Sequence, residues 1–171
     1  MWIVAWMASA GAAAPEVEWT AMAGLQSAFG IPLMGISSPR ERSPSLSLPV
    51  EVNLGIDAGP GFLVRAHVGA GALLNGTYLY TAENGRSVGF PHHIDLALSA
   101  GLRINGISVG ALGGFQLPSR TTVRGFVGWN PEGSPLIVEL RAGANLPTER
   151  RTEPVLQLWV GLNGPLSRNR E

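Results

Sequence analysis

The chemistry available to this chain comes from carboxylates, guanidinium groups, hydroxyls and three histidines, because its 171 residues include no cysteine. The absence of cysteine excludes disulfides and thiolate metal sites. Twelve acidic residues balance twelve basic residues, all of them arginine. The resulting net charge of zero gives no electrostatic reason to expect a nucleic-acid partner.

The histidines offer a candidate metal site that we do not expect to form. His92 and His93 are adjacent, and Asp95 follows shortly after them. His67 lies in a different segment of the chain. A protein zinc site needs at least three protein ligands, and no cysteine is there to complete this set. We predict that the protein binds no metal and no other cofactor.

A hydrolytic site is the second candidate. Ser87, His93 and Glu83 have the side chains of a nucleophile, a base and an acid, which a small barrel enzyme acting on lipids would need at one rim. No family motif surrounds these three residues, and Gly69-Ala70-Gly71 is not followed by the helix of a dinucleotide-binding fingerprint. We predict that the protein is not an enzyme.

The remaining charged residues lie mostly in segments that the sequence predicts to be strands with two different faces, and in the connections between them. Past Val17, apolar and polar residues alternate with a period of two, which indicates strands and not helices. Turn residues such as Asn105-Gly106 separate the alternating segments. Most segments have the length of membrane-spanning strands, which need about 9–11 residues. We predict eight antiparallel strands, at residues 17–29, 45–58, 62–80, 91–104, 107–117, 121–129, 136–146 and 155–163.

Charged side chains occupy only one face of these strands. In the strand 45–58, for example, Val50 and Val52 share one face, and Glu51 and Asn53 share the other. No Arg, Asp or Glu falls on the apolar face of any predicted strand. We predict that the polar face carries a network of charges, made of Glu18, Glu51, Asp57, Arg65, His67, Asp95, Arg103, Arg124, Glu139 and Arg141.

Glycine indicates which face is inside. Most strand glycines lie on the polar face, among them Gly69, Gly101 and Gly143. Glycine weakens a strand, so a water-exposed face has no use for it, whereas the interior of an eight-stranded barrel is short of room. We therefore predict that the polar face lines a lumen and that the aliphatic face meets lipid. The alternative is a soluble lipocalin-like barrel, with the faces reversed and an apolar ligand inside.

Aromatic residues mark both ends of the predicted lipid-facing surface. Membrane–water interfaces select such belts of aromatic side chains. One rim would hold Trp19, Phe62 and Trp129, and the other would hold Phe29, Tyr78, Tyr80, Phe90 and Phe115.

In alternation, strand length and aromatic rims, residues 17–163 resemble the small eight-stranded outer-membrane barrels, the class that includes the OmpA transmembrane domain. The resemblance implies an all-β, antiparallel up-and-down transmembrane β-barrel in the outer membrane of a Gram-negative bacterium. We assign residues 15–164 to the barrel and 165–171 to a polar C-terminal tail. Members of this class usually end on an aromatic residue, whereas the last aromatic residue here is Trp159.

The first residues have the pattern of a secretory signal peptide. The longest apolar run extends from Trp2 to Ala14, which is too short to cross a bilayer as a helix. Small residues offer cleavage after Ala10 or Ala13, although no basic residue precedes the run. We predict that residues 1–14 are a signal peptide or a disordered N-terminus.

The predicted lumen charges favour a structural role, because isolated charges in a narrow interior are costly and must pair. We predict a non-enzymatic outer-membrane barrel that stabilises the envelope or presents surface loops, alone or as a subunit of an envelope assembly. The alternative is a narrow, porin-like channel for ions or small solutes. The predicted partners are membrane lipid and, through the loops 31–44, 81–90 and 147–154, lipopolysaccharide or another envelope protein.

Overall fold

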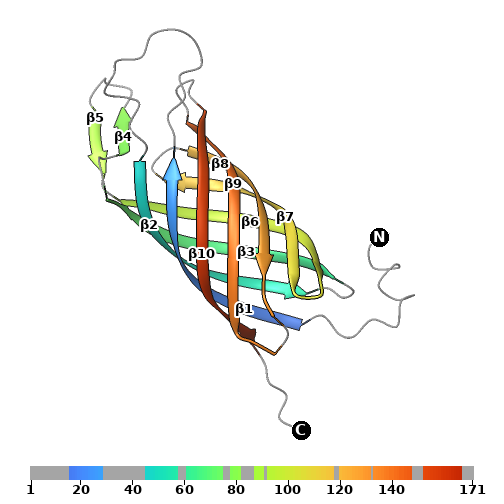
Figure 1. The fold of residues 1–171 in the computed structure, drawn as a ribbon. Helices are drawn as coiled ribbons and strands as arrows, with labels where there is room; N and C mark the ends of the chain where they lie inside the picture. Colours follow the sequence, from blue (N-terminus) through green and yellow to red (C-terminus); the bar gives the residue numbers. More distant parts are fainter. Residues whose placement is uncertain are drawn as a thin grey trace.

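The computed structural model describes residues 16–28, 45–57, 61–74, 78–81, 87–90, 92–117, 120–131, 133–147 and 152–166. This part of the chain forms strands and contains no helix that could cross a membrane (Figure 1). The strands are β1 (Glu16–Ala28), β2 (Ser45–Asp57), β3 (Phe62–Leu73), β4 (Tyr78–Thr81), β5 (Ser87–Phe90), β6 (His92–Ile104), β7 (Ile107–Leu117), β8 (Arg120–Trp129), β9 (Leu136–Pro147) and β10 (Glu153–Pro165).

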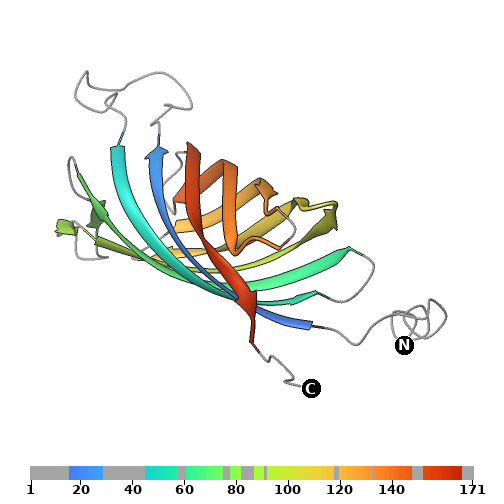
Figure 2. The same cartoon turned by 60° about the horizontal axis from the view of Figure 1, so that its bottom comes forward.

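Eight of these strands close into a barrel. Each barrel strand pairs antiparallel with the next one along the chain, in the order β1, β2, β3, β6, β7, β8, β9 and β10. The last strand then pairs with the first, so that β10 lies beside β1 (Figure 2). β6 and β7 are joined by the two-residue turn Asn105-Gly106, where both residues have positive φ, as a hairpin turn of this type requires. The arrangement confirms the predicted all-β, up-and-down barrel of eight strands.

The predicted strand 62–80 is wrong in its second half. Pairing of β3 with both neighbours ends near Leu73. Tyr78–Thr81 instead pairs with Ser87–Phe90 in a separate two-stranded sheet, β4–β5. The last described bond of this segment to the barrel runs from Leu74 N to Leu46 O on β2, at 2.8 Å, so unbroken alternation in the sequence did not extend the strand to Tyr80. Tyr78, Tyr80 and Phe90 therefore do not belong to the barrel wall, and Phe29 lies outside the described residues.

The register of pairing sets the tilt of the barrel strands. A path through paired residues around the barrel, begun at Glu18, returns to β1 at Ala28, ten residues farther along. With strands about 4.8 Å apart and about 3.3 Å per residue, that offset corresponds to a tilt of about 40° from the barrel axis. Strands of 10–13 residues then rise about 25–32 Å along the axis.

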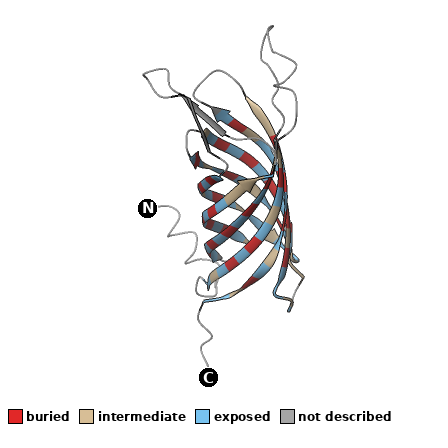
Figure 3. Ribbon diagram, turned by 90° about the vertical axis from the view of Figure 1, so that its left-hand side faces the viewer, coloured by how far each residue is buried: buried red, intermediate tan, exposed pale blue. Residues whose placement is uncertain are grey.

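Burial alternates along every barrel strand that is described. Figure 3 shows buried and exposed residues as alternating bands on the strands. On β2, Glu51 is 5% exposed, whereas the next residue, Val52, is 56% exposed. The buried side chains point into the lumen, so the core of this molecule is the lumen itself and the aliphatic side chains are outside.

Candidate functional site in the barrel lumen

The predicted charge-network residues whose side chains are described lie on the inward face of the barrel strands. The buried members are Glu51, Arg65, His67, Asp95, Arg124, Glu139 and Arg141. Glu18 and Arg103 are half-buried, and the side chain of Asp57 lies outside the described part of the structure. Burial and register place these side chains in one lumen.

Arg141 on β9 is the centre of the largest group. Its two terminal nitrogens donate to the two carboxylate oxygens of Glu51 on β2, at 2.6 and 2.7 Å. Its Nε donates to Glu139 Oε1 at 2.5 Å, and its guanidinium carbon lies 4.7 Å from the ring centre of Trp159. Bidentate, charge-assisted bonds of this kind are the strongest that a guanidinium group makes. Arg141 therefore ties opposite sides of the lumen together.

The group extends through Arg65 and His67 on β3. Arg65 Nη1 donates to Glu139 Oε2 at 2.9 Å. His67 Nδ1 lies 3.0 Å from Glu51 Oε1, and its Nε2 lies 2.7 Å from Ser99 Oγ on β6. We refer to Glu51, Arg65, His67, Glu139 and Arg141 as the central belt. Its two carboxylates balance its two guanidinium groups, so the belt is neutral when His67 is neutral.

Apolar side chains fill the lumen beside the central belt. We refer to this set as the apolar plug; its members are Met22, Leu63, Leu112, Phe126, Ile137 and Trp159. Met22 pairs in register with Glu51, Trp159 with Glu139, and Phe126 with Arg141. Met22, Phe126 and Trp159 therefore lie at the level of the belt, whereas Leu63 and Ile137 lie nearer the short turns.

Inward glycines make room for the largest plug residues. A Cβ atom at Gly24 would lie 2.7 Å from the Trp159 ring, and one at Gly110 would lie 2.8 Å from the Phe126 ring. Only a glycine allows so close an approach. From the sequence, we connected the inward glycines with the scarcity of room in the lumen, but not with the packing of inward aromatic rings. The signal was present, because Phe126 and Trp159 both have the parity of the polar face.

Nearer the long connections, the lumen is lined by amides. Arg124 donates to Gln157 Oε1 at 3.2 Å and to Asn145 Oδ1 at 3.0 Å. Asn145 in turn donates to Gln116, and Gln157 donates to Gln26. We refer to these five residues as the amide layer. A search for charged residues missed four of them, although the inward parity of Gln and Asn in the strands would have identified them.

The two ends of the lumen carry further polar pairs. At the end with the short turns, Arg103 holds both carboxylate oxygens of Glu18, at 2.6 and 2.8 Å. At the opposite end, Arg120 pairs with Glu153. His93 and Asp95 lie near that end on β6, with Nε2 and Oδ2 3.2 Å apart. Among the described residues, no three His, Cys, Asp or Glu side chains are grouped so that they could hold a metal ion.

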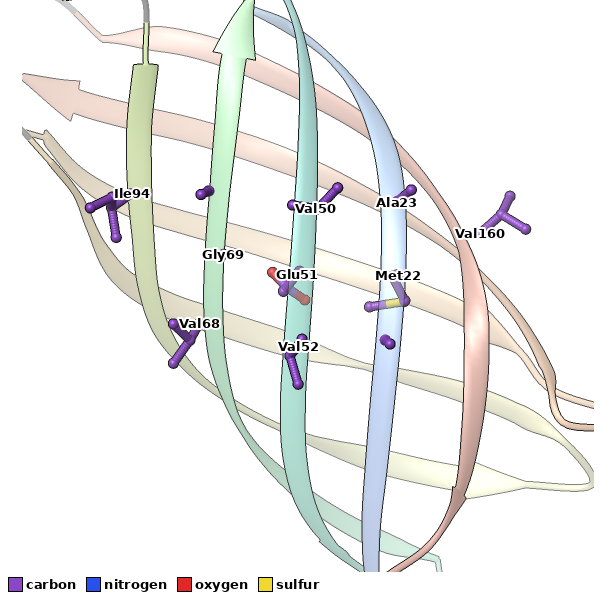
Figure 4. Close-up of a pocket in the computed structure, with 11 residues that line it drawn as sticks. Met22, Ala23, Val50, Glu51, Val52, Val68, Gly69, Ile94 and Val160 are labelled. Atoms are coloured by element: carbon purple, nitrogen blue, oxygen red, sulfur yellow. The ribbon is translucent and has the colours of Figure 1, made fainter.

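The outer wall offers no comparable chemistry. One furrow of about 720 Å³ crosses β1, β2 and β3 and is lined mainly by aliphatic residues (Figure 4). In Figure 4, Val50 and Val52 flank Glu51 on β2, and Val68, Ile94 and Val160 complete the edges. His93 is buried inside the barrel and so does not face this wall.

Exposed aromatic residues stand at both ends of the outer wall. Trp19, Phe62 and Trp129 are exposed at the end with the short turns, and Phe115 is exposed near the other end. These four residues lie at the rims predicted from the sequence. The rim near Phe115 does not include Tyr78, Tyr80 and Phe90, because they belong to the β4–β5 hairpin.

Comparison with known proteins identifies the fold. No protein-family model and no curated protein matches the sequence. A solved structure that does match is that of Ail, the attachment invasion locus protein of Yersinia pestis, in complex with the heparin analogue sucrose octasulfate. The TM-score is 0.55 at 10% sequence identity, over 87% of this chain and 99% of that one. Ail is an eight-stranded outer-membrane barrel, so the predicted resemblance to that class is confirmed for the fold.

Proposed function

We propose that the protein is a non-enzymatic barrel of the bacterial outer membrane, which stabilises the envelope or presents its long connections at the surface. The observation that carries the proposal is the aliphatic outer wall. Leu98, at the middle of β6, is 66% exposed, and Val64 and Val68 on β3 are exposed on the same wall. Monomeric soluble proteins rarely expose apolar patches larger than a few hundred Å². A wall of this kind needs a hydrocarbon environment.

The dimensions of the barrel support the same location. The strands rise about 25–32 Å along the barrel axis, and the hydrocarbon core of a bilayer is about 30 Å thick. The exposed aromatic residues lie at the ends of that span, where membrane interfaces favour them. A soluble barrel with an apolar ligand would need the reverse arrangement, because here the charged side chains are inside.

The packing of the lumen favours a closed barrel over an ion channel. A hydrated ion would have to break the Arg141–Glu51 bonds or displace the apolar plug. Breaking a buried pair is costly because it leaves an uncompensated charge. We therefore expect no stepwise current in a planar bilayer with KCl on both sides. Steady single-channel current from folded wild-type protein would contradict the closed barrel.

Membrane fractionation tests the location. We expect the protein to stay with the outer membrane through a high-salt wash and to be released only by detergent. Release by salt, or recovery in a soluble fraction, would contradict an integral barrel. The same preparation tests the signal peptide, since we expect an intact mass that begins at Gly11 or Ala14. A mass that retains Met1 through Ala10 would exclude cleavage at both sites.

The connections at the end opposite the short turns are the proposed contact with partners. They contain arginine pairs in sequence, Arg40 and Arg42 in one connection and Arg150 and Arg151 in another. Arginine binds phosphate in a bidentate manner, so we propose lipopolysaccharide phosphates as the partner. The heparin analogue bound to Ail is likewise a polyanion. Binding to lipopolysaccharide vesicles should weaken when both pairs are changed to glutamine, and no change would contradict this role.

A further inference from the structure

We propose that one side of the lumen, formed by β2, β3 and β6, conducts protons through His67 while the barrel stays closed to ions. The activity goes beyond the structural role proposed above and rests on the same membrane location. The geometry points to it through three observations. These are the two-sided bonding of His67, orphaned polar atoms on either side of that residue, and an apolar seal across the rest of the lumen.

His67 has the contacts of a proton relay. Its Nε2 lies 2.7 Å from Ser99 Oγ, and its Nδ1 lies 3.0 Å from Glu51 Oε1, so both ring nitrogens are bonded on opposite sides of the ring. A neutral imidazole donates from one nitrogen and accepts at the other. It can therefore take up a proton on one side and release a different proton on the other.

Toward the amide layer, buried polar atoms lack protein partners among the described residues. Asp95 Oδ1 and Gln116 Nε2 are such atoms, and Asp95 and Gln116 face each other in register on β6 and β7. One is an acceptor and the other a donor, and a water molecule satisfies both at once. Gly69 lies opposite Asp95, and Ala97 lies opposite His67. Gly69 is also the register partner of Glu51, so no long side chain on β3 separates Asp95 from the central belt in this row.

A second set of orphaned atoms lies toward the short turns. Both polar atoms of the Asn53 side chain and Nη2 of Arg65 have no hydrogen-bond partner in the described part of the chain. Asn53 is the register partner of His67 on the neighbouring strand. Water at this place would reach the half-buried Glu18–Arg103 pair at the end of the barrel. The relay at His67 is therefore flanked by a hydration site on each side.

The rest of the cross-section is sealed. Trp159, Phe126 and Met22 occupy the level of the belt, and the Arg141–Glu51 bonds span what remains. The charged groups around His67 are Glu51, Arg65, Arg141 and Asp95, and none of them needs to move for a proton to pass. A potassium ion has no such route, because it would have to displace the whole Arg141 guanidinium.

The transfer balances without any co-reactant. Gly69 is the register partner of both Glu51 and Asp95, so Glu51 lies on the Asp95 side of His67, whereas Ser99 is the register partner of Arg65 on the other side. A proton from water beside Asp95 passes through Glu51 Oε1 to His67 Nδ1. The proton on His67 Nε2 passes to Ser99 Oγ as the hydroxyl proton leaves to water beside Arg65 and Asn53. Rotation of the ring restores the first tautomer. The net result is one proton moved along the barrel axis.

Proton flux into vesicles tests the proposal. Wild-type protein is folded into vesicles that hold a pH-sensitive dye, with KCl on both sides and valinomycin to cancel the membrane potential. After a pH step, we expect faster internal acidification than in protein-free vesicles. His67→Gln and Ser99→Ala should slow that protein-dependent flux by about tenfold or more, because a positioned proton-transfer group contributes at least that much.

A matched histidine serves as control. His92 is exposed on β6, outside the lumen, so His92→Gln should leave the flux unchanged. Heat-dependent gel migration shows that each variant is folded. Wild-type flux equal to that of protein-free vesicles, or unchanged flux in His67→Gln, overturns the relay. Potassium leakage that accompanies the protons overturns the closed barrel as well. Failure of wild type to insert at all contradicts the membrane location on which both depend.

Discussion

Glu51 and Val52 are neighbours on β2, yet their surroundings are opposite. Glu51 is bonded to Arg141 and His67 in the lumen, whereas Val52 stands on the outer wall with more than half of its surface exposed. In a soluble barrel the two residues would exchange environments. The difference shows that the strands are stabilised inside by polar bonds and tight packing, and that the aliphatic wall depends on its solvent. Variants of the two walls should therefore behave differently in lipid.

The largest effect is expected from Arg141 in the lumen. Arg141→Ala removes the guanidinium partner of Glu51 and one of the two guanidinium partners of Glu139, and a buried carboxylate that loses its charged partner costs about 3–5 kcal/mol. Urea unfolding in lipid vesicles measures the loss. A double variant with Glu51→Gln should recover part of it, because it removes the stranded charge. Unchanged stability of Arg141→Ala would mean that the lumen is wet at this level.

The next effect is expected on the outer wall. Leu98→Arg places a charge at mid-strand in hydrocarbon, at a cost of about 2–4 kcal/mol. Leu98→Ala is the control, since it keeps the site apolar. We expect poor insertion of the arginine variant into vesicles and normal insertion of the alanine variant. Equal folding of Leu98→Arg and wild type would show that this wall does not face lipid.

A smaller loss is expected in the amide layer. Arg124 is 3% exposed, and the hydrogen bonds described for it go to the neutral side chains of Gln157 and Asn145. Arg124→Gln removes hydrogen bonds to amide oxygens, so these bonds leave no carboxylate without a charged partner. We therefore expect the free energy of unfolding to fall by about 1–2 kcal/mol, typical of one or two hydrogen bonds. Arg141→Ala, measured under the same urea conditions, shows whether the central belt loses more stability than the amide layer. A loss as large as that of Arg141 would show that the amide layer is as dry as the belt.

Alternation in the sequence predicts the face of a residue but not its partners. It placed Arg141 and Glu51 on the same side of their strands, and the even count of strands followed from the same pattern. Partners depend on the offset of ten residues around the barrel, which no single strand records. The end of β3 was missed for a similar reason, because alternation continues past Leu73 where barrel pairing stops. Likewise, inward Phe126 and Trp159 contradicted a purely polar face until glycines opposite them explained the packing.

The smallest effect should come from trimming the outer wall, and β9 allows inside and outside to be compared on one strand. Ile137 is fully buried in the apolar plug, whereas Leu140 is 47% exposed on the outer wall. Ile137→Ala leaves a cavity in a packed interior and should cost about 2–5 kcal/mol. Leu140→Ala leaves no cavity, because lipid chains close over the shortened side chain, so its cost should stay below about 1 kcal/mol.

The same two variants also test whether the outer wall faces lipid and the lumen is packed with protein side chains. In lipid vesicles, urea midpoints should fall clearly for Ile137→Ala and hardly at all for Leu140→Ala. The two substitutions remove apolar side chains of equal size, so their difference reports packing and not hydrophobicity as such. If the order were reversed, the outer wall would be buried against protein in the native assembly and the lumen would be loosely filled. That result would contradict both the lipid-facing wall and the closed barrel, since each assignment depends on the other through the alternation of the strand.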